Sequence, residues 1–175
     1  ANLPRENHNR VLLVLGEKGL GKNSLLTELK YDAELREIEV IAPGETPRRR
    51  PAVSFLSAEA FAARSESGNP MKLLEQSSLG VALRPEQEAE ALRIFSGQNP
   101  ECLRLRPLNL DETESYLREV TRNPEIPTPL LQGLHQWSRG YPGPLREALQ
   151  GLLKDPLSVD SSGKWRLAVF QEAGP

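Results

Sequence analysis

The chain has 175 residues, a formal net charge of −2, 38% apolar residues and 26% charged residues. This length allows one sizeable core with a small appended subdomain. The near-neutral charge argues against attraction of the whole surface to nucleic acid or anionic membranes, and no apolar run approaches the roughly 18 residues of a membrane helix. The first residues show no signal-peptide pattern and Cys102 is the single cysteine. We therefore expect a cytoplasmic protein without internal disulfides.

The first half of the chain alternates between strand-like and helix-like segments. Short apolar runs predict strands at residues 10–15, 37–42, 52–56, 79–83 and 102–105. Apolar spacing and a leading proline predict helices at residues 23–29, 57–63 and 85–95. Alternation of this kind predicts an α/β fold with a parallel sheet.

The second half is predicted to be mostly helical. Asp111 and Glu114 have the spacing of a capping box, which predicts a helix that begins there. Thr128 followed by Pro129 predicts the start of a second helix, and Gly140 predicts its end. The apolar positions at helical spacing in this half are Thr113, Tyr116, Leu117, Val120, Leu130, Leu134, Trp137, Leu145, Ala148, Leu149, Leu152 and Leu153.

The segment Gly16–Ser24 (GEKGLGKNS) follows the first predicted strand and opens the first predicted helix. It matches the G-x-x-x-x-G-K pattern of a P-loop, in which inward-turned backbone N–H groups cradle phosphates and the lysine reaches the β and γ phosphates. The alternative is a glycine-rich turn that has lost its ligand. The residues that the motif assigns to a phosphate site are Gly16, Gly19, Leu20, Gly21, Lys22, Asn23 and Ser24.

The two positions that usually handle Mg²⁺ in such proteins are irregular. A P-loop lysine is normally followed by a hydroxyl that binds Mg²⁺, whereas Asn23 offers an amide oxygen and is the candidate metal ligand here. Ser24 is one residue late, roughly 100° around a helix. Ser57 stands where a core strand usually ends in Asp, and Glu59 is the nearest substitute for a catalytic acid, although a surface glutamate is the alternative. We expect weak or absent hydrolysis, and whether the protein is an ATPase stays open.

Four motifs follow one another in the order found in the signal-transduction (STAND) class of AAA+ P-loop ATPases. They are residues 11–22 (VLLVLGEKGLGK), 81–86 (VALRPE), 103–113 (LRLRPLNLDET) and 137–142 (WSRGYP). The chain resembles a divergent member of this class over most of its length. The resemblance implies bound ATP or ADP, with Mg²⁺ as a further candidate cofactor. It also implies that Pro142 lies near the base or ribose, that Arg84 lies near the sensor-1 position, and that Arg146 is the nearest sensor-2 candidate.

The same resemblance implies three parts: a P-loop core at residues 1–107, a helical lid at 108–155 and a C-terminal hairpin at 156–175 that begins a winged-helix-like module. Nucleotide would bridge core and lid, and the lid would report nucleotide state to a protein partner. Relatives assemble into rings or arcs, which makes a homo-oligomer a further expectation. One alternative is an interaction scaffold that lost its nucleotide and works through the lid and the Trp165 hairpin. A winged DNA reader ranks last, since residues 144–154 carry two basic residues against one acidic residue.

Several other residues have two interpretations. The run Arg48–Arg50 is typical of a solvated basic loop more than of an arginine finger or a nucleic-acid patch. Trp137 is expected in the core rather than in a stacking role, because of its spacing from Leu130 and Leu134. Cys102 is expected to be a small buried apolar residue of a strand.

Overall fold

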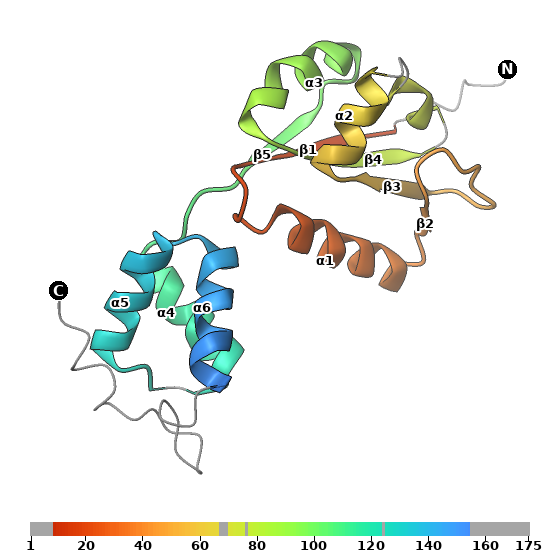
Figure 1. The fold of residues 1–175 in the computed structure, drawn as a ribbon. Helices are drawn as coiled ribbons and strands as arrows, with labels where there is room; N and C mark the ends of the chain where they lie inside the picture. Colours follow the sequence, from red (N-terminus) through yellow and green to blue (C-terminus); the bar gives the residue numbers. More distant parts are fainter. Residues whose placement is uncertain (1–8, 67–69, 76, 124, 155–175) are drawn as a thin grey trace, which may run out of the picture. The chain divides into compact units, whose positions relative to one another are not determined.

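The computed structural model describes residues 9–66, 70–75, 77–123 and 125–154. Within them it contains a five-stranded, all-parallel sheet and six α-helices, shown in Figure 1. The strands are β1 (Val11–Leu15), β2 (Glu39–Ile41), β3 (Ala52–Leu56), β4 (Ser78–Leu83) and β5 (Glu101–Arg104). The helices are α1 (Lys22–Leu35), α2 (Ala58–Glu66), α3 (Glu88–Ile94), α4 (Leu110–Thr121), α5 (Thr128–Ser138) and α6 (Pro142–Lys154). The predicted parallel α/β sheet is confirmed.

The chain divides into two compact units. The first consists of residues 1–18 and 22–105, and the second of residues 19–21 and 106–175. The second unit thus includes the middle of the glycine-rich loop, Gly19–Gly21. The predicted hairpin at 156–175, with Trp165, lies outside the described residues. In the described part of the chain, no helix is long and apolar enough to cross a membrane.

The sheet of the first unit has the strand order β2-β3-β4-β1-β5. The connection after β1 therefore runs outward to β2 at one edge, whereas the connection after β4 passes over β1 to β5 at the other. Figure 1 shows α1 on one face of the sheet and α2 and α3 on the other. Loops from the neighbouring strands β1 and β4 thus lead to opposite faces. In open α/β sheets, ligands bind at the carboxyl ends of strands beside such a switch.

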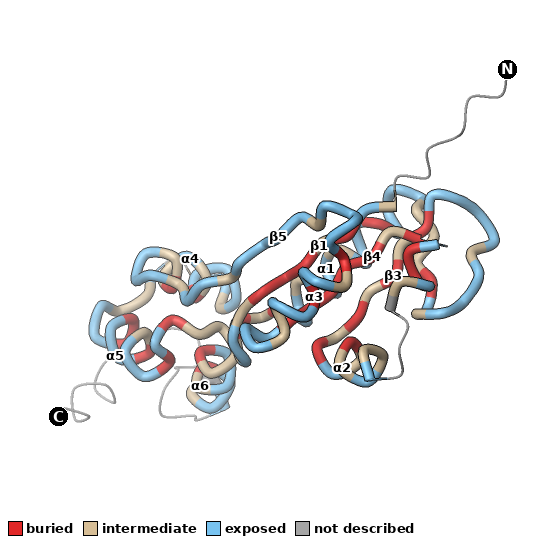
Figure 2. Tube along the Cα trace, turned by 90° about the horizontal axis from the view of Figure 1, so that it is seen from above, coloured by how far each residue is buried: buried red, intermediate tan, exposed pale blue. Residues whose placement is uncertain are grey.

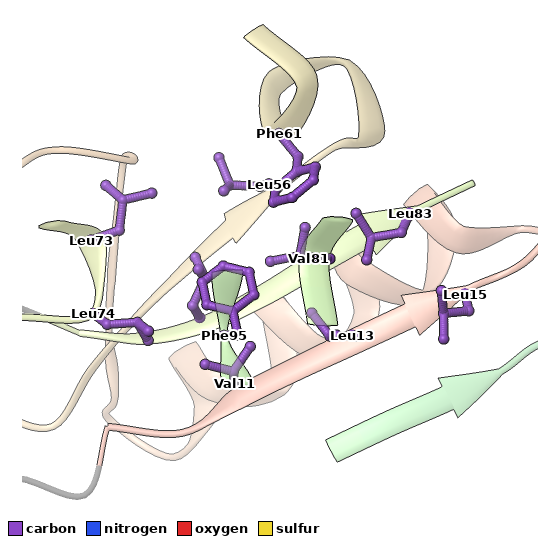
Figure 3. Close-up of a cluster of buried hydrophobic side chains, with 12 residues drawn as sticks. Val11, Leu13, Leu15, Leu56, Phe61, Leu73, Leu74, Val81, Leu83 and Phe95 are labelled. Atoms are coloured by element: carbon purple, nitrogen blue, oxygen red, sulfur yellow. The ribbon is translucent and has the colours of Figure 1, made fainter. Parts of the chain in front are cut away.

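The main core lies between the sheet and the α2–α3 face. Alternate residues of β1 and β4 meet Phe61 of α2 and Phe95, which directly follows α3, and all of these side chains are buried (Figure 3). The two phenyl rings are 6.3 Å apart. The opposite face is covered by α1, where Leu26 packs on Val14 and Ala82. Figure 2 shows the buried strands β1 and β4 in red and the exposed edge strand β5 in pale blue.

The second unit is a three-helix arrangement with its own core of leucines. They are Leu117 of α4, Leu130, Leu131 and Leu134 of α5, and Leu145 and Leu149 of α6. Buried Thr113 bridges two helices, since its hydroxyl lies 2.8 Å from the Asn109 carbonyl oxygen and 2.9 Å from His135 Nδ1. The predicted stop at Gly140 is confirmed, because α5 ends at Ser138 and Gly140 adopts φ 74°.

Three predictions about side chains and ends were wrong. The capping box of α4 is formed by Asn109 and Glu112, not by Asp111 and Glu114. Trp137 is 63% exposed, because it lies on the flank of the buried stripe of α5 rather than within it. Cys102 is exposed, because β5 is an edge strand whose residues are all exposed.

One further helix boundary and one further side chain differ from prediction. The segment predicted as one helix over 85–95 is a short 3₁₀ turn, Pro85–Gln87, followed by α3. Val120, placed on the apolar stripe of its helix, is 46% exposed.

Candidate phosphate-binding site

The glycine-rich loop connects the buried strand β1 to α1 at the carboxyl edge of the sheet. The Gly16 amide donates a hydrogen bond to the Leu83 carbonyl at 3.3 Å, which joins the ends of β1 and β4. Gly19 and Gly21 adopt φ values of 93° and 84°, a left-handed conformation that favours glycine. Alternating conformations of this kind turn successive N–H groups toward one concave side, where anions bind.

Helix α1 begins at Lys22 and runs for 14 residues. Its first turn contains no acidic residue. The positive end of the helix dipole and the unpaired N–H groups of the first turn are therefore not offset by a carboxylate of that turn. This arrangement suits an anionic ligand at the end of β1.

The Lys22 side chain is held inside the loop. The residue is only 8% exposed, and its ammonium group donates hydrogen bonds to the carbonyl oxygens of Gly16 and, at 2.7 Å, of Glu17. Both acceptors are neutral. The loop therefore already holds a charged nitrogen at its mouth, bound to groups that an anion could replace.

The surroundings of Lys22 act on its charge in two directions. Burial, and next the positive charge of Arg84, lower the pKa of Lys22 below its ordinary value. Three carboxylates oppose this shift: Glu59, Glu86 and Glu17. Because the net shift of the Lys22 pKa is downward, the surroundings do not fully compensate the charge of its ammonium group. A further anion in the loop would stabilise that charge.

Arg84 and Glu59 form an ion pair at the same edge of the sheet. Arg84 directly follows β4, and its Nη2 lies 2.8 Å from Glu59 Oε1 in the first turn of α2. The pKa of Glu59 lies below its ordinary value because its own backbone N–H, Arg84 and the Ser57 side chain bind the ionised carboxylate. Gln87 fixes the two segments, since its Oε1 accepts from the Arg84 N–H and its Nε2 donates to the Ala58 carbonyl, each at 2.9 Å.

The structure brings together most of the residues predicted from the loop. Lys22 and Glu59 lie within electrostatic reach of each other. Asn23 and Ser24 are exposed on the first turn of α1. Leu20 is buried, at 7% exposed, so it supports the loop rather than contacting a ligand with its side chain.

Gly19 and Pro142 both belong to the second unit. Pro142 is the first residue of α6, and the next residue, Gly143, donates its N–H to the Gly19 carbonyl at 2.9 Å. A Cβ atom on Gly143 would lie 3.1 Å from that carbonyl oxygen, so the close approach favours glycine.

The donor groups at this edge do not fit Mg²⁺ well. Mg²⁺ favours carboxylates, hydroxyls and phosphates in a near-octahedral set. The Ser57 hydroxyl instead accepts the Ala60 N–H at 3.2 Å and caps α2. Glu59 is engaged by Arg84, and Asn23 supplies only a neutral amide. Among the residues that the structure describes, no three His, Cys, Asp or Glu side chains are grouped to hold a metal.

The link between Arg84 and Glu59 was not foreseen from the sequence. The two residues are 25 positions apart and meet only because β3 and β4 are neighbours in the sheet. One signal could have shown that Arg84 starts a helical turn. Gln87 stands three residues after it, the spacing at which a side chain accepts a hydrogen bond from the backbone N–H at the start of a helix.

Comparison with known proteins gives no match to any family model and no match to any curated protein.

Proposed function

We propose that this protein binds the phosphates of ATP or ADP in the loop at Gly16–Ser24 and acts as a nucleotide-dependent regulatory or adaptor module. The observation that carries the proposal is Lys22, whose buried ammonium is held at the mouth of the loop by two carbonyl oxygens. A charged group is costly to bury without an opposite charge. A phosphate that replaced these carbonyls would supply that charge.

Several features beside Lys22 support a phosphate ligand. The loop follows a strand at the point where the connections switch faces, and α1 directs its positive end at the same place. Gly19 and Gly21 have the backbone conformation that exposes N–H groups to an anion. All of these features favour the same class of ligand, an anion.

Weak or absent hydrolysis is part of the proposal. Glu59 is the nearest candidate base, but a carboxylate whose pKa is lowered accepts a proton poorly. Its Oε1 is also engaged by the hydrogen bond from Arg84 at 2.8 Å. Binding without turnover suits a module that reports which nucleotide is present, to a protein partner or to further copies of this chain.

The test is thermal unfolding and calorimetric titration of the purified chain with ATP, ADP and GTP. A ligand that binds only the native state adds about 2.7 kcal/mol of apparent stability at a hundredfold excess over Kd. We expect a rise in Tm that Lys22→Ala abolishes. The matched control is Lys30→Ala, which removes an exposed lysine from the same helix. Folded, ligand-free protein that shows no shift with any nucleotide would contradict the proposal.

A second candidate function is a protein-interaction scaffold without nucleotide. The specific observation that favours it is Trp137, whose indole is 63% exposed on α5. Exposed tryptophans are enriched at interfaces. The two functions are separable, because Trp137→Ser would leave the nucleotide shift intact while weakening a partner contact made by α5.

A further inference from the structure

We infer that this site binds its nucleotide without Mg²⁺, with the Arg84 guanidinium as the second cation beside Lys22. The inference rests on the proposed function. It comes from the side chains at this edge of the sheet, which differ from those that a nucleotide site with Mg²⁺ requires.

The first step concerns the ligands that a metal would need. After Lys22 comes Asn23, so α1 offers no hydroxyl at the position next to the lysine. At the end of β3 stands Ser57, whose hydroxyl is already used as the cap of α2. Mg²⁺ gives up its bound water reluctantly and requires well-placed oxygen ligands. Asn23 offers only a neutral amide oxygen, and the Ser57 hydroxyl is engaged by the Ala60 N–H.

The second step concerns the carboxylate that follows β3, Glu59, which acts on Lys22 more strongly than Glu86 or Glu17 does. Glu59 lies in the first turn of α2 and accepts from its own backbone N–H, from Arg84 at 2.8 Å and from the Ser57 side chain. These donors compete with a metal-bound water for the same oxygens. Recruiting Glu59 to Mg²⁺ would therefore first require the loss of this ion pair.

The third step concerns the charge that a metal would otherwise neutralise. Arg84 directly follows β4, which is the neighbour of β1 in the sheet. Leu83, the last residue of β4, accepts a hydrogen bond from the Gly16 N–H and so holds the loop after β1 close to Arg84 in the chain. The charge of Arg84 reaches Lys22, since it contributes to the lowered pKa of that lysine. A guanidinium binds phosphate oxygens in bidentate fashion and stays charged at every physiological pH.

The fourth step is an exchange of anions. The Arg84 side chain is 45% exposed and its partner Glu59 is 67% exposed, so their ion pair is weak and can open. On binding, a phosphate would take the place of the Glu59 carboxylate on Arg84 and of the carbonyls on Lys22. Each cation thereby keeps hydrogen-bond partners throughout, and the guanidinium of Arg84 binds phosphate oxygens at a site whose side chains offer Mg²⁺ poor ligands.

The experiment compares calorimetric titrations of ATP and ADP in excess chelator and in millimolar Mg²⁺. We expect the two Kd values for each nucleotide to agree within about a factor of two. Arg84→Gln should weaken ATP binding in chelator by about tenfold to a hundredfold, the loss expected for hydrogen bonds to a charged group. The matched control Arg93→Gln, an exposed arginine of α3, should bind as the parent protein does.

A variant that gains a metal ligand tests the inference from the opposite direction. Asn23→Thr restores the missing hydroxyl at an exposed helix position, where it should not disturb folding. We expect Mg²⁺ to tighten ATP binding to this variant and not to the parent protein. Binding of the parent only in the presence of Mg²⁺ would overturn the inference and leave the proposed function standing. No binding in either buffer would overturn the proposed function itself.

Discussion

Burial of Lys22 lowers the stability of the fold without ligand, although the same ammonium group is the proposed phosphate ligand. Its pKa is lowered in the folded chain, so between that value and the ordinary value of 10.5 the unfolded chain holds more protons. The free energy of unfolding should therefore rise with pH through this window because of Lys22. We expect the difference in Tm between the parent and Lys22→Met, without ligand, to shift in favour of the parent as the pH rises from about 7 toward 10. A difference that moves the opposite way would show that the buried ammonium is stabilised in the fold.

Glu59 is the residue whose removal should improve binding. If phosphate displaces it from Arg84, Glu59→Gln removes the competing anion. Because an exposed ion pair is weak, we expect nucleotide Kd to fall by at most about fivefold, measured by calorimetric titration. Glu66→Gln, at the far end of the same helix, is the control and should leave Kd unchanged. Weaker binding by Glu59→Gln would instead assign Glu59 a direct part in holding the ligand.

At the scale of elements, two glycines of the second unit should respond oppositely to the same change. Gly140 has φ 74°, and a Cβ atom there would lie 2.1 Å from the Leu108 carbonyl oxygen. Gly133 lies inside α5 with open space around it. In chemical denaturation, we expect Gly140→Ala to lower the free energy of unfolding by more than about 2 kcal/mol and Gly133→Ala to raise it by about 0.5–1 kcal/mol. Equal effects would mean that the turn after α5 relaxes freely.

The start of α4 gives a second prediction at this scale. The Asn109 side chain accepts the Glu112 N–H at 2.9 Å, and the Glu112 carboxylate accepts the Asn109 N–H at 2.8 Å. Asn109→Ala should therefore lower the free energy of unfolding by about 1 kcal/mol, whereas Asp111→Ala should cost less, since Asp111 acts only through the helix dipole. A larger loss for Asp111→Ala would favour the cap that the sequence predicts.

That cap also shows why some parts of the fold could be predicted and others could not. The strand at 52–56 was predicted to the residue, because its apolar run is short and bounded by proline and serine. Asn109 and Asp111, by contrast, each precede a glutamate at the right spacing. The choice between them goes with a side-chain contact outside the capping pattern, the two hydrogen bonds from Arg106, six residues earlier, to Glu112 at 2.7 and 2.8 Å.

The candidate site could also be predicted only in part. Its P-loop residues are consecutive, so the sequence alone predicted where Lys22 would stand. The Arg84–Glu59 pair depends on strand order, which no local pattern contains. Trp137 and Cys102 were misplaced for a related reason: periodicity gives the direction of a side chain, but not whether another element covers it.

At the scale of the whole molecule, the described residues form separate cores. The buried clusters around the sheet draw on residues 11–105, and the third on residues 108–152. We expect destabilising changes to act locally. Gly80→Ala places a Cβ atom 2.6 Å from the Phe55 ring and should reduce hydrogen-exchange protection in the strands of the first unit, while Gly140→Ala should reduce it in α4–α6. Loss of protection throughout the chain from either variant would show that the two units unfold together.

The edge strand β5 has a consequence for how the protein behaves in a crowded solution. In the described chain it pairs with β1 alone, and it is four residues long with Glu101 and Arg104 at its ends. Unpaired strand edges recruit other chains unless they are short or charged. A chain that added here would have to strip water from a carboxylate and a guanidinium to gain very few backbone hydrogen bonds. The sheet is thereby protected from growing into an aggregate at the β5 edge.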